Sequence, residues 1–592
     1  MAGSRMVTSP PVALSPAQWS RDVARLGSDD LDVLVVGGGV VGAGAALDAA
    51  TRGLRVGIVE AQDWASGTSS RSSKLVHGGL RYLAMLDLHL VREALHERAV
   101  LLETAPHLVR PVAFLYPLRR RVRDRAVVGA GVGLYDLLAR SARRPGSLPS
   151  HRHLTRERAL ALAPALRAAD VVGAVEYYDA QVDDARHTLA LVRTAVSHGA
   201  IAASRVRAEG LVAENGRVRG ARVVLEETGG TALVRARVVI AATGVWPAPA
   251  VEETASHHGD ARGAPGDRVP GAPADRTVRP SKGVHLVLAR ERIRSERALI
   301  VPTARSVLFV LPWGAHWIVG TTDTEWPYDA SHAAASGADV DYLIGELNAV
   351  LATPVSRRDV ESVFVGLRPL VAGRELETTR LSREHAVGRP TPGVVVVSGG
   401  KYTTYRVMAR DAVDAAVADA RLDAPASATD RVALVGASFP EGRRAYRDHV
   451  ADAHALGRET VDRLCDRYGS LAGEVLSPAV RDSGLARPIA GAPAYLRAEA
   501  RYAVTHEGAR HLEDVLARRT RASIDAPRRG LDAAAEVAEL VGETLGWDRS
   551  TVGSEVADYR RGVAAQELGE SAPDDARAFA TVREDTRLLP LP

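Results

Sequence analysis

The sequence predicts an α/β protein that ends in a separate α-helical domain, and three observations support this prediction. Short β-branched runs alternate with helical stretches between about residues 31 and 420. Within the first of these units, residues 31–42, a glycine-rich turn joins an apolar strand to a helix. After a Pro- and Asp-containing linker at 421–430, apolar residues recur at three- and four-residue spacing, for example in 499–520 and 531–545. The length of 592 residues is enough for two or three domains.

Composition excludes several classes of protein. The 76 basic residues nearly balance the 72 acidic ones, so the net charge of +4 does not indicate a nucleic-acid binder. A single cysteine, Cys465, cannot form an internal disulfide, which indicates a reducing, cytoplasmic compartment. The least polar stretch, 32–48, is shorter than the ~20 apolar residues that a membrane-spanning helix needs. Residues 1–30 lack the apolar block of a secretory signal and are expected to form a short, partly ordered leader.

The strongest local signal is the glycine-rich turn of the first strand–helix unit. A strand at 31–36 is followed by glycines that allow a sharp turn, a close approach to a pyrophosphate and tight packing of the helix at 40–52. That helix stops at Gly53, and a second strand ends at an acidic residue suited to accept hydrogen bonds from ribose hydroxyls and to disfavour a 2′-phosphate. The sequence therefore predicts a dinucleotide site. Its expected residues are Gly37, Gly38, Gly39, Gly42 and Glu60.

Three downstream segments favour FAD over NAD. Residues 66–74 are dense in hydroxyl groups suited to further phosphate and ribitol contacts. Residues 241–244 and 398–401 are two more strand-to-glycine turns, which place Gly244, Gly399 and Gly400 where backbone can approach one extended cofactor. Each of these turns alone is equally compatible with an ordinary loop, so the prediction of FAD depends on their combination.

From about residue 32 to residue 408 the sequence closely resembles the FAD-dependent glycerol-3-phosphate dehydrogenases. Seven blocks support the resemblance: residues 68–82, 178–186, 281–285, 318–323, 366–370, 382–385 and 399–406. All three lysines of the chain, Lys74, Lys282 and Lys401, fall in or beside these blocks, which predicts that they lie near one active site. One departure is Ala242, where the family usually has asparagine.

The resemblance implies a fold of the glycine/D-amino-acid oxidase type. A Rossmann-type FAD-binding domain would comprise residues 31–110, 170–250 and 363–420. An antiparallel-sheet substrate domain would comprise residues 111–169 and 251–362. A C-terminal helical domain would comprise 431–592, and the Gly- and Pro-rich stretch at 252–275 is expected to be an exposed insertion.

The resemblance also implies a reaction: oxidation of sn-glycerol 3-phosphate to dihydroxyacetone phosphate by hydride transfer to FAD, with electrons passed to a membrane quinone. This chemistry needs a base near the reacting carbon and cations around a phosphate. We expect His285 to be the base, with His77 as its competitor, and Lys401 to stabilise negative charge.

The remaining site residues are assigned from the matched blocks. Arg368 is expected to act in catalysis and to bind phosphate. The other expected substrate contacts are Arg81, Tyr82 and Arg383. The other expected cofactor contacts are Thr68, Ser69, Ser70, Lys74, His77, Gly78 and Lys401. No metal site is indicated, and Asp183-Asp184 is interpreted as a turn or a helix cap.

Three alternatives stay open: an oxidase that passes electrons to oxygen, a non-catalytic flavin-binding membrane scaffold, and an NAD-linked dehydrogenase. The arginines of 119–125 precede an apolar, small-residue stretch at 126–138, which is typical either of a peripheral contact with the inner face of the cell membrane or of a solvated loop before a core helix. A homodimer is also compatible with the amphipathic C-terminal helices.

Overall fold

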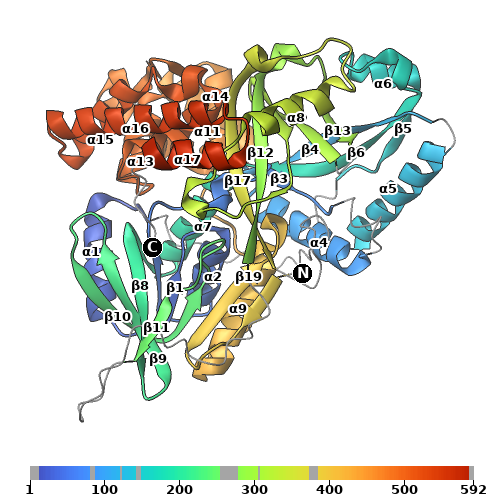
Figure 1. Cartoon of the computed structure of the whole chain (residues 1–592). Coiled ribbons are helices and arrows are strands. Elements are labelled where there is room, and N and C mark those ends of the chain that lie inside the picture. Colours follow the sequence, from blue (N-terminus) through green and yellow to red (C-terminus); the bar gives the residue numbers. More distant parts are fainter. Residues whose placement is uncertain are drawn as a thin grey trace.

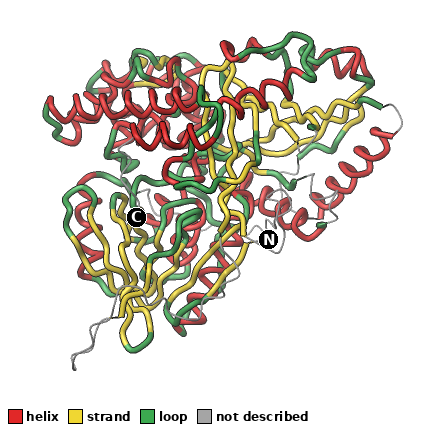
Figure 2. Tube along the Cα trace, in the orientation of Figure 1, coloured by secondary structure: helices red, strands yellow, loops and turns green. Residues whose placement is uncertain are grey.

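A computed structural model describes residues 12–79, 87–120, 123–141, 148–253, 278–303, 307–371 and 385–585. The chain forms two sheet-containing bodies and a helical C-terminal body (Figure 1). Figure 2 shows the strands in two groups, one low in the view and one at the upper right, with the C-terminal helices beside both. This arrangement confirms the predicted α/β architecture with a C-terminal helical domain.

The first sheet has nine strands, in the order β11-β8-β9-β10-β1-β2-β7, with β19 paired to β10 and β18 paired to β19. Strand β10 is central, because its first half pairs with β9 and its second half lies parallel to both β1 and β19. The bounds are β1 Leu31–Val36, β2 Val56–Glu60, β7 Ile201–Ser204, β8 Val206–Glu214, β9 Arg217–Leu225, β10 Thr231–Ala241, β11 Ala250–Glu253, β18 His385–Gly388 and β19 Val394–Gly399.

Helices cover both faces of this sheet. The side chains of Val33 and Val35 share a core with α2 (Val40–Thr51), α7 (Asp184–Ser197) and α9 (Tyr405–Ala420). Leu34 and Val36 face the opposite core, as the period-two alternation of a strand requires. That core also contains Leu26 of α1 (Pro16–Ser28), so this part of the expected, partly ordered leader forms a helix packed against the sheet.

The second sheet has ten strands, in the order β16-β12-β15-β14-β13-β4-β6-β3, with β17 paired to β12 and β5 paired to β6. All pairs are antiparallel except β13 with β4. The bounds are β3 Leu75–Val76, β4 Val109–Leu118, β5 Arg152–Leu154, β6 Gly173–Val182, β12 Val278–Ala289, β13 Ala298–Pro302, β14 Val307–Trp313, β15 His316–Gly320, β16 Thr324–Glu325 and β17 Val360–Val371. The helices associated with this body are α4 Leu88–Thr104, α5 Arg123–Ser141, α6 Arg156–Leu162 and α8 Gly337–Asn348.

Sheet pairing differs from the expected domain division at two places. Strand β6 was assigned to the FAD-binding domain, but it pairs with β4 over its whole length. Strand β17 was expected to fall mostly in the FAD-binding domain, and it pairs with β12. The linker at 421–430 is irregular in structure, and almost the whole expected insertion at 252–275 lies outside the described residues.

The C-terminal body is helical with its own core, which contains Leu464, Tyr502 and Val537. Its helices are α10 Arg443–His454, α11 Arg458–Tyr468, α12 Ala472–Leu476, α13 Arg497–Thr505, a π-helix Asp514–Thr520, α14 Ala522–Asp525, α15 Ala534–Leu545, α16 Arg549–Gly569 and α17 Asp575–Asp585. Two short strands, β20 Pro488–Ile489 and β21 Ala492–Leu496, were not expected. The pattern predicted for 499–520 is interrupted after Thr505, and Gly508 adopts a left-handed conformation, φ +70°, in the break.

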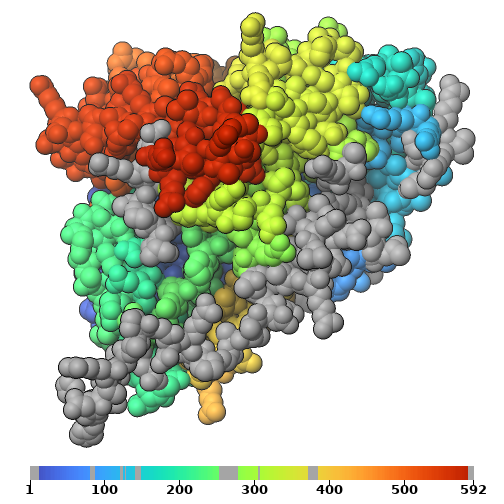
Figure 3. All heavy atoms as spheres, viewed as in Figure 1, coloured from blue at the N-terminus to red at the C-terminus, as the bar shows by residue number. Residues whose placement is uncertain are grey.

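The C-terminal body contacts both other bodies. Figure 3 shows it, in orange to red, pressed against the yellow-green residues of the second body. Among the described residues, no helix combines the length and apolar character that crossing a bilayer requires. No cluster of three or more metal-ligating side chains occurs in the described part of the chain.

Candidate active site

The turn after β1 is built as the sequence predicts. Gly37 has φ +109°, and a Cβ atom there would lie 2.6 Å from the carbonyl oxygen of Ala242. A Cβ on Gly42 would lie 1.9 Å from the carbonyl oxygen of Gly37, so only glycine lets α2 approach the turn. The N-terminus of α2 then faces the cavity with Gly39 as its N-cap, the arrangement that binds phosphate groups.

Glu60 ends β2 beside this turn. Its carboxylate accepts hydrogen bonds from the backbone N–H groups of Gly38 (2.6 Å) and Gln62 (2.8 Å). Burial raises the pKa of Glu60 above its usual range. The side chain lines the cavity at the end of the parallel strand, where a ribose acceptor is expected.

A cavity of about 1170 Å³ lies between the two sheets. This exceeds the roughly 300–1,000 Å³ typical of small-molecule sites, as an extended dinucleotide plus a substrate requires. Twelve predicted site residues line it: Gly37, Gly39, Glu60, Thr68, Ser69, His77, Gly244, His285, Arg368, Gly399, Gly400 and Lys401. Segments far apart in the sequence therefore meet at one site, and the three glycine turns all reach it.

We call residues 68–74 the serine segment, which forms one wall of the cavity. The Ser69 hydroxyl accepts a hydrogen bond from the N–H of Val40 at the start of α2 (2.9 Å). The Thr68 hydroxyl donates to the carbonyl of Leu367 (2.6 Å), next to Arg368. The Ser73 hydroxyl is hydrogen-bonded to Nε2 of His285 (2.8 Å). The segment thus connects the N-terminus of α2 to His285 and to the backbone next to Arg368.

His285 lies on β12 with its ring stacked on Phe364 of β17, 4.6 Å between centroids and 7° between planes. The side chain is buried, and Nδ1 has no hydrogen-bond partner among the described residues. Burial, together with the nearby charges of Arg368 and Lys74, holds the pKa of His285 well below its usual range. The imidazole is therefore neutral near pH 7.

Arg368 reaches across β12 from the neighbouring strand β17. Its guanidinium donates to the Thr321 hydroxyl (3.0 Å) and to the Thr322 carbonyl (3.1 Å), and it lies 3.4 Å from the Asp323 carboxylate. A Cβ on Gly283 would lie 2.6 Å from Nη2 of Arg368, so the guanidinium occupies the space that a side chain would take. Gly283 and His285 are on the same face of β12 because they are two residues apart.

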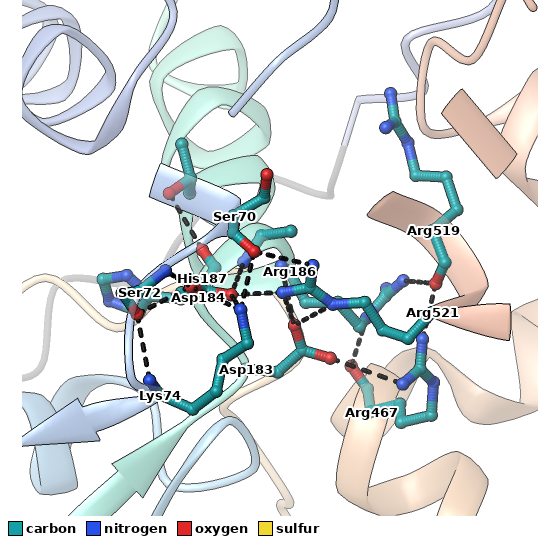
Figure 4. A network of polar contacts seen from close by, with 12 residues as sticks. Ser70, Ser72, Lys74, Asp183, Asp184, Arg186, His187, Arg467, Arg519 and Arg521 are labelled. Carbon is teal, nitrogen blue, oxygen red and sulfur yellow. Dashed lines mark hydrogen bonds and ion pairs between the residues drawn. The ribbon is translucent and has the colours of Figure 1, made fainter. Parts of the chain in front are cut away.

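Five predicted cofactor residues do not line the cavity: Gly38, Gly42, Ser70, Lys74 and Gly78. The ammonium of Lys74 is buried, and it donates to the Ser70 carbonyl (2.6 Å) and to both carboxylate oxygens of Asp184 (2.9 Å) (Figure 4). Lys74 holds the serine segment from behind. Arg81, Tyr82 and Arg383 lie outside the described residues.

Sequence reasoning gave no individual role to Asp184, Tyr402 and Phe364. Asp183 is the N-cap of α7, as the helix-cap interpretation predicts, but Asp184 is a fully buried acceptor for several groups. Tyr402 lines the cavity and donates to the Asp184 carbonyl (2.9 Å). Asp184 and Tyr402 fall in matched blocks of the sequence, which was the available signal.

The chain is similar to known flavoproteins over most of its length. Residues 32–415 match the family model described as FAD dependent oxidoreductase, and residues 427–552 match the C-terminal domain of alpha-glycerophosphate oxidase. Glycerol-3-phosphate dehydrogenase 2 of Mycobacterium tuberculosis is 49% identical over 570 residues, which cover 96% of this chain and 94% of that protein. The mitochondrial glycerol-3-phosphate dehydrogenase of Homo sapiens is 36% identical, covering 91% of this chain and 74% of that protein.

Solved structures agree with these matches. The glycerol-3-phosphate dehydrogenase from Bacillus halodurans, complexed with FAD, has a TM-score of 0.72 at 26% identity, covering 95% of this chain and 99% of that chain. The L-alpha-glycerophosphate oxidase from Mycoplasma pneumoniae, with FAD bound, shares the fold with a TM-score of 0.51 at 16% identity, covering 68% of this chain and 98% of that chain. The chain therefore belongs to the family of FAD-dependent glycerol-3-phosphate dehydrogenases, and its cofactor is FAD.

Proposed function

We propose that this protein oxidises sn-glycerol 3-phosphate to dihydroxyacetone phosphate and passes the electrons to a membrane quinone. One observation carries the proposal: a neutral imidazole and a guanidinium occupy the same face of β12, in a cavity that the dinucleotide-binding turn also lines. The two positions, Gly283 under the guanidinium and His285, are two residues apart, or about 7 Å along an extended strand. This spacing suits a small substrate with a hydroxyl at one end and a phosphate at the other.

His285 would take the hydroxyl proton of the substrate. A general base must be unprotonated at the working pH, and the depressed pKa of His285 satisfies this condition. Ser73 is hydrogen-bonded to Nε2, and the buried Nδ1 lacks a partner among the described residues.

Arg368 would bind the phosphate, because a guanidinium pairs well with phosphate oxygens. Arg81, Tyr82 and Arg383 are proposed as further phosphate contacts from the matched blocks of the sequence. Lys401, in the cavity wall after Gly399 and Gly400, would stabilise negative charge that develops during the reaction.

FAD, when bound, supplies the hydride acceptor. We propose that its pyrophosphate lies at the turn of Gly37 and Gly39, its ribose at Glu60, and its remaining length along the serine segment, Gly244 and the Gly399-Gly400 turn. The close approach of backbone at Gly37 and Gly42 and the size of the cavity support this placement.

The quinone acceptor is supported by the position of α5. This helix contributes Val128, Val132 and Leu134 to the cavity wall, while Leu137 is 64% exposed. The exposed Arg119 and Arg120 precede it, which suits a surface of anionic lipid. An apolar acceptor could then move between a membrane and the cavity along α5. The cytoplasmic location, the peripheral membrane contact and a homodimer remain predictions from the sequence.

Oxygen is a second candidate acceptor, because residues 427–552 match a domain described from an alpha-glycerophosphate oxidase. Turnover in air with and without an added quinone separates the two. Stoichiometric hydrogen peroxide with no quinone reduced would contradict the quinone proposal.

The substrate is tested by anaerobic stopped-flow reduction of the bound flavin with a panel of phosphorylated and unphosphorylated alcohols. We expect rapid bleaching with sn-glycerol 3-phosphate and little with glycerol, because the phosphate would lose its Arg368 contact. Equal rates for the two would contradict a phosphate site, and no bleaching with any alcohol would favour the non-catalytic scaffold.

The base is tested with His285→Ala, which should slow flavin reduction by about 10²–10⁴-fold. His316→Ala is the matched control, since His316 lies on the adjacent strand β15, pairs with Glu361 and does not line the cavity. In the parent protein, the rate of flavin reduction should stay constant to well below pH 6.5, because burial depresses the pKa of His285. A base with the pKa of a free imidazole, about 6.5, would instead lose half of the rate near that pH. Fast reduction in His285→Ala would assign the base to another group.

A further inference from the structure

Arg521, in the C-terminal body, has an unusual conformation for its residue type. It follows the π-helix Asp514–Thr520 with φ +88°, in the left-handed region that side chains rarely adopt. Such a conformation is energetically unfavourable and persists where the surrounding structure requires it. The side chain is only 1% exposed, so the guanidinium of this strained residue lies in the interior of the protein.

The guanidinium of Arg521 crosses to the FAD-binding body (Figure 4). It donates to Asp183 Oδ1 from Nε (3.2 Å) and Nη2 (2.9 Å), and to the Ser70 carbonyl from Nη1 (3.1 Å). It also forms a buried ion pair with Asp184. None of these three acceptors lines the cavity, but Ser70 belongs to the serine segment, of which Ser69, Ser72 and Ser73 do.

Asp184 transmits this contact to the serine segment. Its Oδ2 accepts from the backbone N–H of Ser72 (3.0 Å) and from the Ser72 hydroxyl (2.6 Å). The same carboxylate pairs with Lys74, whose ammonium also holds the Ser70 carbonyl. Ser70, Ser72 and Lys74 are therefore fixed from behind by one hydrogen-bonded cluster that contains Arg521.

The next residue, Ser73, is held between these anchored neighbours and contacts the site. Its hydroxyl is 2.8 Å from Nε2 of His285. Arg521 and His285 thus belong to different bodies of the molecule and are joined by four residues, Asp184, Ser72, Lys74 and Ser73.

We propose that Arg521 is a positioning residue for the reaction: by anchoring Asp184 and Ser70 it fixes the serine segment, and through Ser73 it sets the orientation of His285 toward the substrate. The inference rests on the proposed role of His285 as the base. It gives the C-terminal body a part in the oxidation itself, in addition to packing.

The test compares Arg521→Gln with Arg519→Gln in the FAD-containing protein. Arg519 is the matched control because it is equally buried and crosses the same interface, where it makes a bidentate pair with Asp63 (2.7 Å and 2.7 Å). Two quantities are measured: the limiting rate of flavin reduction by glycerol 3-phosphate with the apparent substrate Kd, and hydrogen–deuterium exchange of the peptide 66–77.

We expect Arg521→Gln to lower the limiting rate by about tenfold or more, as for a misplaced base, with little change in substrate Kd and with faster exchange in 66–77. Arg519→Gln should change both readouts by less than about twofold, although it removes a buried ion pair of the same kind. A parental rate and exchange in Arg521→Gln would overturn the proposal. Equal losses in the two variants would also overturn it, because they would report general loosening of the interface.

If Arg521→Gln yields no folded protein, the question is decided with Arg521→Lys, alone and combined with Ser73→Ala. Removal of the Ser73 hydroxyl breaks the last connection to His285, so Arg521→Lys should slow the reaction much less in the Ser73→Ala background than in the parent. Equal fold effects in both backgrounds would overturn the proposal. A normal rate in His285→Ala would instead refute the assignment of the base, and an inert parent protein would refute the proposed substrate.

Discussion

Arg368 uses both arms of its guanidinium to keep its place on the cavity wall. Thr321 and the Thr322 carbonyl hold Nη2, and the Asp323 carboxylate lies on the Nη1 side. This support orients the guanidinium before the substrate binds, so little side-chain entropy would be lost when it binds a phosphate.

Substitution of Arg368 by alanine should therefore weaken transition-state binding strongly. We expect kcat/KM for glycerol 3-phosphate to fall about 30- to 1,000-fold, which corresponds to a loss of about 2–4 kcal/mol in transition-state binding. Arg279→Ala is the control, because Arg279 lies on β12 opposite β17 but pairs with Glu325 at the partly exposed end of the strand. Similar kinetics in the two variants would remove Arg368 from the substrate site.

The three lysines show how far residue-level prediction from the sequence extends. All three were expected near the active site, but only Lys401 lines the cavity. Lys74 lies behind the serine segment, and Lys282 is buried between Asp339 and Asp575. Lys282 is one residue away from Gly283 on β12, so it points to the opposite face. Sequence proximity to a functional block does not reveal the face on which a side chain lies.

At the scale of elements, the unit β1–turn–α2 depends on one glycine contact. Gly42→Ala would bring a Cβ within 1.9 Å of a backbone oxygen, and neither backbone can move without displacing the turn. We expect the variant to lose FAD during purification, measured as the ratio of flavin to protein absorbance. Gly345→Ala in α8, with no atom near the added Cβ, should retain FAD and gain about 0.5–1 kcal/mol of stability. Full FAD occupancy in Gly42→Ala would contradict the close packing.

Helix α5 gives a second prediction at this scale. Leu137→Glu should reduce binding to vesicles that contain anionic lipid by about tenfold or more, because burying a leucine contributes about 1.5–3 kcal/mol. Leu568→Glu on α16 is the control, since Leu568 is similarly exposed, 57% against 64%, on the C-terminal body. If both variants bind vesicles like the parent protein, α5 does not contact the membrane.

Most elements of the two sheets could be predicted, but their partners could not. The strand expected at 31–36 is confirmed as β1, and the second strand, which ends at Glu60, is confirmed as β2. Strands β6 and β17 were placed in the wrong body, because an apolar alternation specifies a strand but not its neighbour in the sheet. The segment at 499–520 was expected as one helical run, but it breaks after Thr505, and Arg521 beyond it acquires its role only through contacts with residues more than 300 positions away.

At the scale of the molecule, the C-terminal body is joined to the FAD-binding body by buried ion pairs. Arg186 pairs with Glu507, Arg519 with Asp63, and Arg521 with Asp183 and Asp184. Removing one partner of such a pair is strongly destabilising, by about 3–5 kcal/mol, because the other charge stays buried. We infer that the interface is permanent in the working protein.

His511 provides a pH-dependent contact at this interface. It lies between Glu227 of the β9–β10 turn and Glu555 of α16, whose carboxylates, against the opposing effect of burial, raise its pKa to about 9. A histidine with a folded-state pKa above its unfolded value of about 6.5 contributes stability that is complete below pH 6.5 and is lost as the pH rises toward 9. The free energy of unfolding should fall over this range.

The measurement is chemical denaturation of the parent protein, His511→Gln and His449→Gln between pH 6 and pH 9.5. We expect His511→Gln to be less stable than the parent at pH 6 and to approach it near pH 9.5. His449→Gln, which removes an exposed imidazole from α10, should follow the parent throughout. A constant difference between His511→Gln and the parent would show that folding does not raise the pKa of His511.

The distribution of lysine has a practical consequence for covalent chemistry. The chain has only three lysines, two of them with no solvent-exposed area and the third in the wall of the cavity. Acylating reagents and amine-directed crosslinkers therefore find no lysine on the exterior of the folded protein. The Nζ atom of Lys401 is itself buried, so acylation of any lysine would report that the protein has opened or unfolded.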